Sequence, residues 1–405
     1  MPALENLKII ELCTMNAGPY CGKVLADLGA EVIKVEPLSG DPSRRSGPFP
    51  QDIPHPERSG TFFYLNTNKL GITLDVESRT GQHIMRQLLQ QADVFLEDWP
   101  PGALDALDLG YNALSQTSPA LVVTSITPFG QTGPYRNYKA HPLNTYHAGG
   151  EGYTTPGSGA HLGWNLYSDR PPLNAPGNAG EQFAGVQAAL ATLMAVFGRS
   201  GTGRGQHVDV SKLEGLMNLS RGVLVEYPNQ GVIENRASYK HPIGGPFQCK
   251  GGYVQIGINN DAVWKGLVDL MGNPEWALKE EYATRPGRTA HGEVINDGLA
   301  EWCLTQTRDY IYHEGQARGI PISPYLTPSE VYASPQYRHR GYFVDVEFPG
   351  AGKVAMASAP YHFTRTPWSL RRPAPGLGEH NQEVLGERLG YSKEDIVRLR
   401  ACGII

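Results

Sequence analysis

The stretch LKIIELCTMNAGPYCGKVLADLGAEVIKVE, residues 7–36, decides the fold class. It opens with an apolar, isoleucine-containing run at 7–12, continues with a helix-like segment at 17–28, and closes with a second β-branched run at 31–35. A strand, a helix and a strand in close succession predict a βαβ unit, whose two strands lie parallel in one sheet. We therefore expect an α/β protein.

The same alternation continues along the chain. Further strands are predicted at 72–75, 94–96, 121–125 and 207–210, with a helix at 80–91. An open α/β sheet binds its ligand beyond the carboxyl ends of its strands. The loops at those ends are predicted at 13–19, 36–41, 97–102 and 126–135.

A longer helix is predicted at 181–197. Its large apolar residues recur at helical spacing, which predicts that they face the core: Phe183, Val186, Leu190, Met194 and Phe197. The loop 201–205, rich in glycine, ends this helix.

A chain of 405 residues is too long for one core, because single cores stop growing near ~250–300 residues. We predict a large Rossmann-like domain over 1–215, completed by 340–405. A smaller α+β domain is predicted over 225–330, where a strand at 253–258 is followed by helical patterns.

Charge and composition exclude several classes of function. A formal net charge of −5 argues against nucleic acid or an anionic membrane as the main partner. The most apolar run, 188–197, has about half the ~20 residues that a membrane span needs. Five cysteines without a C-x-x-C pair indicate reduced thiols. We expect a cytoplasmic protein that binds neither nucleic acid nor membrane.

The common catalytic and cofactor motifs are missing from the sequence. It has no G-x-x-x-x-G-K-[ST] loop and no G-x-S-x-G elbow, and its histidines show no H-x-x-x-H spacing. No metal site is predicted.

Glu181 is the most informative single residue. It follows GNAG (177–180) and enters a largely apolar helix in its first turn. There the helix dipole stabilises a carboxylate by ~0.3–1 kcal/mol, which suits a nucleophile or base. The alternative is the ordinary enrichment of acidic residues in first helical turns.

Taken in order, the motifs resemble the class III coenzyme A (CoA) transferase family, which includes formyl-CoA:oxalate and carnitine-CoA transferases and α-methylacyl-CoA racemase. The matching segments run almost end to end: 16–36, SGDPSR (39–44), LNTNKLGITLD (65–75), 92–114, FGQTGPY (129–135), GEQFAGVQAALA (180–191), TGRGQHVDVS (202–211) and LGEHNQEVLGERLG (377–390).

The resemblance implies a Rossmann-like large domain, a small domain and a homodimer of interlocked rings. It implies CoA transfer from an acyl-CoA to a small carboxylic acid, with CoA and acyl-CoA as substrates and no tightly bound cofactor. The family's nucleophilic aspartate falls on Glu181, so the expected intermediate is a glutamyl-CoA thioester.

The resemblance also implies roles for other positions. Asn16 falls near the reacting carboxylate and Lys139 near CoA. Asp98 and Trp99 stand where the family often has Asn-Phe against the adenine. Lys34 and Asn68 lie in matching motifs at the CoA edge of the sheet.

Three departures from the family pattern stand out. Ala106 replaces an arginine that often contacts a CoA phosphate, so another cation must compensate. Pro142 occupies a slot that is often acidic. The glycine-rich flap is reduced to HPIGGP (241–246).

His141 keeps a second function open. In the racemase relatives a His-Asp pair lies here, and His141 with Glu181 would form two opposing acid/base groups at the α-carbon of an acyl-CoA. A non-catalytic CoA-binding protein is the third reading. The aromatic residues Tyr146, Tyr153, Trp164 and Tyr167 are hypothesised to line the acyl pocket.

Overall fold

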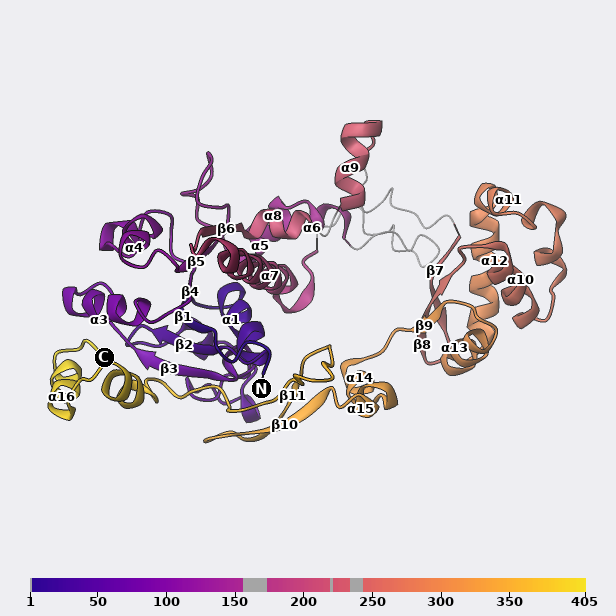
Figure 1. Ribbon diagram of the computed structural model, residues 1–405. Helices are drawn as coiled ribbons and strands as arrows, with labels where there is room; N and C mark the ends of the chain where they lie inside the picture. The colour runs from indigo at the N-terminus through magenta and orange to yellow at the C-terminus, as the bar shows by residue number, and fades with distance from the viewer. Residues whose placement is uncertain (1, 156–172, 219–220, 234–242) are drawn as a thin grey trace. The chain divides into compact units, whose positions relative to one another are not determined.

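The chain divides into two compact units. The computed structural model describes residues 2–155, 173–218, 221–233 and 243–405 (Figure 1). The first unit comprises Met1–Gly149, Ala175–Arg221 and Gln336–Ile405, and the second comprises Gly150–Asn174 and Gly222–Pro335.

A six-stranded sheet forms the centre of the first unit. Its strands are β1 (Lys8–Leu12), β2 (Glu31–Glu36), β3 (Lys69–Thr73), β4 (Val94–Glu97), β5 (Val122–Thr127) and β6 (His207–Ser211). They lie in the order β3-β2-β1-β4-β5-β6, and every neighbouring pair is parallel. This is the doubly wound Rossmann order, so the predicted α/β class is confirmed. Strand β3 begins and ends earlier than the predicted 72–75.

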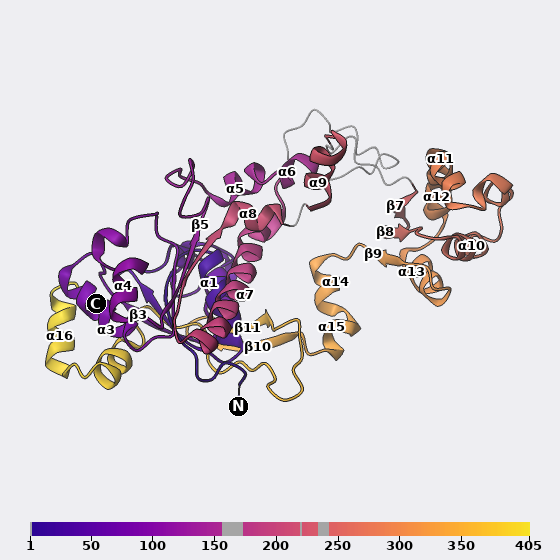
Figure 2. The same ribbon diagram turned by 45° about the horizontal axis from the view of Figure 1, so that its top comes forward.

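Helices cover both faces of this sheet. On one face α1 (Ala17–Asp27) and α7 (Ala179–Thr202) pack side by side (Figure 2). The other face is covered by α3 (Arg79–Leu89) and α4 (Tyr111–Thr117), with α16 (Lys393–Ala401) and a π-helical segment at Gln382–Arg388. Because successive side chains of a strand point to opposite faces, Ile9 of β1 packs into the core on the α1–α7 face and Ile10 into the core on the other face.

The first unit contains further helices and a hairpin. They are α2 (Gly60–Asn66), α5 (Pro142–Ala148), α8 (Lys212–Met217), α15 (Pro335–His339) and the hairpin β10 (Phe343–Phe348) with β11 (Gly352–Ala357). The hairpin is anchored on α2, where the rings of Phe63 and Phe348 stack with centroids 3.9 Å apart.

The second unit combines an antiparallel sheet with helices. Its strands are β7 (Gly244–Cys249), β8 (Gly252–Gly257) and β9 (Ile322–Pro324). Its helices are α6 (Glu151–Thr154), α9 (Arg221–Gln230), α10 (Asp261–Leu270), α11 (Arg285–Ala290), α12 (Gly292–Thr305), α13 (Arg308–Ala317) and α14 (Pro328–Ala333). Phe247, Trp264 and Leu299 lie in its core.

The predicted inner face of the long helix is wrong for four of its five residues, and the fifth, Phe183, is half-buried. The large residues Val186, Leu190, Met194 and Phe197 of α7 are exposed, Phe197 to 81%. The buried side consists of small residues and the first-turn carboxylate: Glu181, Ala184, Gly185, Ala188, Ala189, Thr192 and Ala195. A Cβ at Gly185 would lie 2.5 Å from the carbonyl oxygen of Ala17. Because α1 and α7 approach so closely, only small side chains fit between them.

The same helix has the length and composition of a membrane span. Among the described residues, the segment Pro176–Thr202 contains an 18-residue window with a mean hydropathy of 1.2. A core helix can share these properties, and α7 packs against α1, β5 and β6.

Candidate active site

Two loops meet at the carboxyl edge of the sheet, between the central strands β1 and β4. The backbone N–H of Thr14, after β1, donates to Asp98 Oδ2, after β4, at 2.9 Å. The N–H of Met15 donates to Asp41 Oδ1 at 3.1 Å. This is the point where the strand order changes direction, which is where such sheets bind ligands.

A buried lysine supports this edge from beneath. Lys34 Nζ donates to the carbonyl oxygen of Cys13 at 2.9 Å and pairs with Asp41 at 2.8 Å and Glu11 at 3.2 Å. Burial alone would lower the pKa of Lys34, but the carboxylates of Asp41 and Glu11 outweigh it and raise that pKa. Its side chain is 0% exposed. Lys34 therefore supports the loop at the edge where its motif was expected, and its side chain is not exposed to solvent.

Glu181 lies at the same edge and forms a buried ion pair. Its Oε2 lies 2.8 Å from Lys212 Nζ, and the side chains of Glu181 and Lys212 are 4% and 16% exposed. Glu181 stands in the first turn of α7 and Lys212 is the first residue of α8. Both residues lie at the start of a helix, and α7 and α8 pack against each other, so this packing positions the pair.

The packing of α7 explains why the two residues meet. Gln187 Nε2 of α7 donates to the carbonyl oxygen of Gly215 in α8 at 3.0 Å. A Cβ at Gly180 would lie 3.1 Å from Leu216, so α8 rests directly on the first turn of α7. Strand β6 runs without a break into α8, which brings Lys212 to the carboxyl edge.

The electrostatics of the site are set by one cation and two carboxyl groups. Burial alone would lower the pKa of Lys212, but Glu181 and Asp98 outweigh it and raise that pKa, so the ammonium stays charged. Desolvation raises the pKa of Asp98 to about 7, although Lys212 and the Thr14 N–H act in the other direction. Asp98 is thus a group that exchanges its proton near neutral pH.

Asn16 is buried at the start of α1, with 4% of its surface exposed. It directly precedes Ala17, whose carbonyl oxygen contacts Gly185, one helical turn after Glu181. Asn16 and Glu181 therefore belong to the same end of the α1–α7 contact.

A cavity of about 580 Å³ opens beside Asp98 and Trp99. It is lined by the carboxyl ends of the first four strands and the loops that follow them. The lining residues are Leu12 in β1 and Thr14 after it, Val35 in β2 with Pro37, Leu38 and Ser39 after it, Leu74–Glu77 after β3, and Asp98–Pro100 after β4. Its described lining contains no lysine or arginine. The guanidinium of Arg45, an exposed residue, donates to the carbonyl oxygen of Ser39 at 3.0 Å and brings a cation to the rim.

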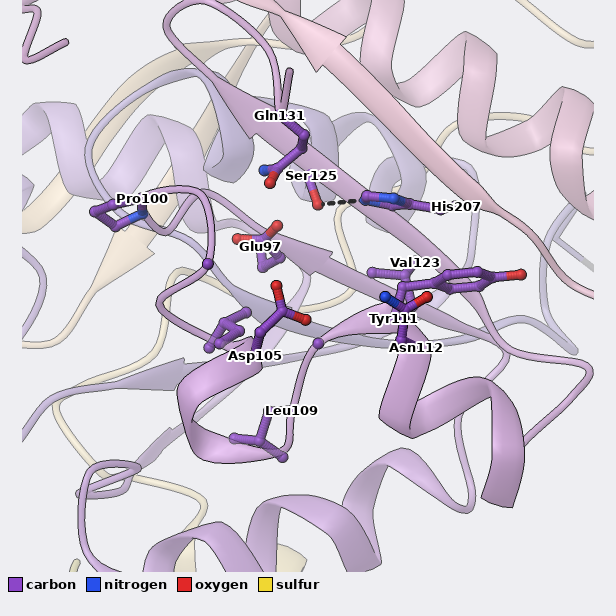
Figure 3. A pocket seen from close by; sticks show the side chains of 13 residues that line it. Glu97, Pro100, Asp105, Leu109, Tyr111, Asn112, Val123, Ser125, Gln131 and His207 are labelled. Atoms are coloured by element: carbon purple, nitrogen blue, oxygen red, sulfur yellow. Dashed lines mark hydrogen bonds between the residues drawn. The ribbon is translucent and has the colours of Figure 1, made fainter. Parts of the chain in front are cut away.

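A second, smaller cavity of about 100 Å³ lies on the α4 side of the sheet (Figure 3). There Ser125 Oγ lies 2.8 Å from His207 Nε2, and Ser125 also hydrogen-bonds Glu97. Glu97 Oε2 accepts a hydrogen bond from the backbone N–H of Trp99 at 2.8 Å. Desolvation raises the pKa of this buried carboxyl to about 7, against the Ser125 and Trp99 hydrogen bonds. Glu97 therefore fixes the Trp99 loop of the larger cavity.

His141 and Lys139 are exposed on the segment between β5 and α5. The backbone N–H of His141 donates to Asn144 Oδ1 at 2.8 Å, at the start of α5. Helix α5 packs against α7 and α8. Within the described residues, no hydrogen bond or ion pair joins His141 to Glu181.

Asn68 lies away from the expected edge. It directly precedes β3, so it stands at the amino edge of the sheet. Its Nδ2 donates to Asp27 at 2.7 Å, and its Oδ1 accepts from the backbone N–H of Arg371 at 2.7 Å. The side chain joins the C-terminal segment to α1 because its amide has both donor and acceptor capacity. The expected place of Asn68 at the CoA edge is therefore corrected.

The hypothesised acyl pocket falls partly outside the described residues. Tyr146 is buried in α5 and Tyr153 is exposed in α6 of the second unit. Trp164 and Tyr167 lie outside the described residues, as do residues 241 and 242 of the shortened flap.

Sequence reasoning missed Lys212 and Glu97. Lys212 lies two residues after the end of the predicted strand 207–210, at the edge where ligands bind, so its position was a usable signal. The pairing of Lys212 with Glu181 could not be predicted, because the two residues are 31 positions apart and meet only through helix packing.

The family model described as CoA-transferase family III matches residues 4–381. A succinyl-CoA–D-citramalate CoA-transferase of Chloroflexus aurantiacus is 32% identical, over 99% of this chain and 98% of the relative. A formyl-CoA:oxalate CoA-transferase of Rhodopseudomonas palustris is 31% identical, over 100% of this chain and 97% of the relative.

A solved structure shares the fold. The crystal structure of a CAIB/BAIF family protein from Brucella suis superimposes with a TM-score of 0.81 at 29% identity. It covers 95% of this chain and 99% of the other.

Proposed function

The chain belongs to CoA-transferase family III, and on that premise we propose that it transfers CoA through a covalent thioester on Glu181. It is an enzyme of this class, and its substrates are an acyl-CoA and a carboxylic acid. The observation that carries the proposal is the buried Glu181 carboxylate, held by Lys212 at the ligand-binding edge of the sheet.

The reaction consists of two matched exchanges. A Glu181 carboxylate oxygen attacks the carbonyl carbon of the acyl-CoA, the C–S bond breaks, and a mixed anhydride and CoA thiolate form. The thiolate attacks the Glu181 carbonyl carbon and releases the donor acid, which leaves a glutamyl-CoA thioester. The acceptor carboxylate then repeats both steps in the opposite sense and regenerates Glu181.

The residues around Glu181 support this chemistry. The Lys212 ammonium lies 2.8 Å from the Glu181 carboxylate and holds it in place for attack as the nucleophile. Asn16 offers an amide at the same end of the α1–α7 contact, where it can hydrogen-bond a developing oxyanion.

The larger cavity is the proposed site of the CoA nucleotide. Trp99 offers an aromatic face for the adenine, and Asp98 a hydrogen-bonding group. Because Ala106 carries no charge, we assign Arg45 at the rim, with Lys139 on the neighbouring loop, to the phosphates.

The racemase alternative requires two opposing groups at one carbon. The counter-ion of Glu181 is Lys212, and His141 is exposed at the start of α5. These positions favour transfer, and the assay below separates the two reactions.

We also propose that the protein acts as a homodimer. Val186, Leu190, Met194 and Phe197 form an exposed apolar stripe on α7. Adjacent apolar residues of this kind mark association surfaces more often than they remain in water.

The test is an exchange assay with donors and acceptors taken from the relatives. Succinyl-CoA or formyl-CoA is mixed with oxalate or citramalate, and new acyl-CoA is followed by chromatography in deuterated water. The proposal predicts a new acyl-CoA with ping-pong kinetics and, for succinyl-CoA, whose α-carbon carries exchangeable hydrogens, no deuterium at that carbon. Deuterium incorporation without CoA exchange would instead identify a racemase.

A further inference from the structure

The Glu181–Lys212 pair has a consequence for the second half of the reaction. Lys212 Nζ pairs with Glu181 Oε2 at 2.8 Å, and both side chains are largely buried. When Glu181 becomes a thioester, it is neutral and can no longer balance the ammonium. A buried cation without a partner is costly, so a replacement anion is favoured there.

The surroundings offer Lys212 one other carboxyl group among the described residues that act on it, Asp98. Asp98 already accepts a hydrogen bond from the Thr14 N–H. Desolvation raises its pKa to about 7, so near neutral pH a substantial fraction of Asp98 carries no charge. Asp98 therefore replaces the charge of Glu181 only in part.

We propose that Lys212 binds the carboxylate of the acceptor acid after Glu181 has been converted to the thioester. The acceptor then occupies the place that the Glu181 carboxylate held, beside the carbonyl carbon that it must attack. This inference rests on the proposed covalent transfer and adds a specificity element to it: the site takes an anionic acceptor only in the thioester state.

Charge is conserved at each step when the acceptor carboxylate replaces that of Glu181 at Lys212. Before the reaction Lys212 faces one carboxylate, that of Glu181. In the thioester state it faces one carboxylate, that of the acceptor. When the acceptor attacks, its C–O bond forms, the thioester C–S bond breaks and the thiolate carries the negative charge. The thiolate then attacks the acceptor carbonyl, and the charge returns to Glu181.

The proposal is tested first by binding, without chemistry. Glu181→Gln is uncharged like the thioester and nearly isosteric with the native side chain, so it frees the Lys212 ammonium. By calorimetry we expect Glu181→Gln to bind oxalate or citramalate about tenfold more tightly than wild type, the strength of a charge-assisted hydrogen bond. The double variant Glu181→Gln/Lys212→Met should lose that gain. Equal affinity in wild type and both variants would overturn the proposal.

A kinetic test uses the glutamyl-CoA form itself. Wild type, Lys212→Met and Lys212→Arg are charged with donor acyl-CoA, desalted, and mixed either with the acceptor acid or with hydroxylamine. For Lys212→Met we expect the half-saturating acceptor concentration to rise about tenfold, while the neutral nucleophile hydroxylamine reacts at the wild-type rate. Lys212→Arg should recover part of the acceptor affinity because it keeps the charge.

The controls distinguish a failure of the inferred role of Lys212 from a failure of the proposed covalent transfer on Glu181. Lys393→Met removes a lysine that likewise begins a helix, α16, and should leave both reactions unchanged. A parallel loss of acceptor and hydroxylamine reactivity in Lys212→Met would mean a structural role only and would overturn the inference. Absence of a thioester in wild type would contradict the proposed function, whereas the binding test of Lys212 would still stand on its own result.

Discussion

Asp98 Oδ2 accepts a hydrogen bond from the backbone N–H of Thr14 at 2.9 Å, which joins the loops after β1 and β4 at the switch point of the sheet. The preceding residue, Glu97, holds the backbone N–H of Trp99 in the same loop. The edge that would bind CoA is thus organised by two adjacent carboxyl groups, and both of their pKa values are raised to about 7.

The buried carboxyl of Glu97 makes stability depend on pH. Because desolvation raises its pKa from 4.5 to about 7, the folded protein holds this proton more tightly than the unfolded chain does. The resulting stability is complete below pH 4.5 and is lost as pH rises through 7. Between pH 5 and pH 8, the free energy of unfolding measured with urea should fall in wild type by on the order of 2 kcal/mol more than in Glu97→Gln. Equal losses in the two proteins would contradict this.

The close approach of α1 and α7 predicts a sharp difference between two glycines of one helix. Gly185→Ala would bring a Cβ to 2.5 Å from the Ala17 carbonyl oxygen, while a Cβ at Gly198 meets nothing within 4 Å. We expect Gly185→Ala to destabilise the fold by about 1–3 kcal/mol and to lower kcat, because Glu181 lies one turn away. Gly198→Ala should be neutral or stabilise the helix by up to ~1 kcal/mol. Thermal unfolding of both variants tests this prediction, and similar free energies of unfolding for Gly185→Ala and Gly198→Ala would argue against the close packing of α1 and α7.

The cation at the cavity rim is tested with a truncated substrate. Arg45→Ala should raise the KM for acyl-CoA about tenfold with little change in kcat, because a phosphate contact binds substrate and transition state alike. With an acyl-pantetheine, which lacks the phosphates, wild type and variant should behave alike. An equal KM increase for both substrates would remove Arg45 from the phosphate site.

The exposed stripe on α7 predicts the oligomeric state. Wild type should elute as a dimer in size-exclusion chromatography with light scattering, and Met194→Glu/Phe197→Glu should shift it to monomer, because two charges would have to be buried. Val397→Glu, at an apolar residue of α16 that is 67% exposed, serves as control and should leave the dimer intact. A monomeric wild type would contradict the proposal.

The strands were predictable because their signals are local. Each run of β-branched residues is a strand in the sheet, although β3 starts at Lys69, ahead of the predicted Ile72. The face of α7 was not predictable from periodicity alone. Its large and its small apolar residues both recur at helical spacing, and the short distance to α1 selects the small ones for the interior.

The site was predictable only in part for a related reason. Glu181, Asn16, Asp98 and Trp99 each stand beside a predicted strand end or helix start, and the structure places them at one edge. Asn68 stands at the opposite edge because it precedes β3. Its position ahead of the predicted strand 72–75 indicated that edge, whereas the resemblance of its motif did not. The partner of Glu181 depends on how α8 packs on α7, which involves no local pattern.

The proposed transfer requires that Glu181 carries CoA covalently. Intact-protein mass spectrometry after incubation with succinyl-CoA or formyl-CoA tests it, with and without hydroxylamine, on wild type, Glu181→Gln and Glu181→Asp. The account predicts a CoA-sized adduct on wild type that hydroxylamine converts to a hydroxamate at residue 181, and no adduct on Glu181→Gln. Glu181→Asp keeps the carboxylate but shortens the arm, so it should form the adduct more slowly. An adduct that persists in Glu181→Gln, or CoA exchange by wild type without any adduct, would contradict the account.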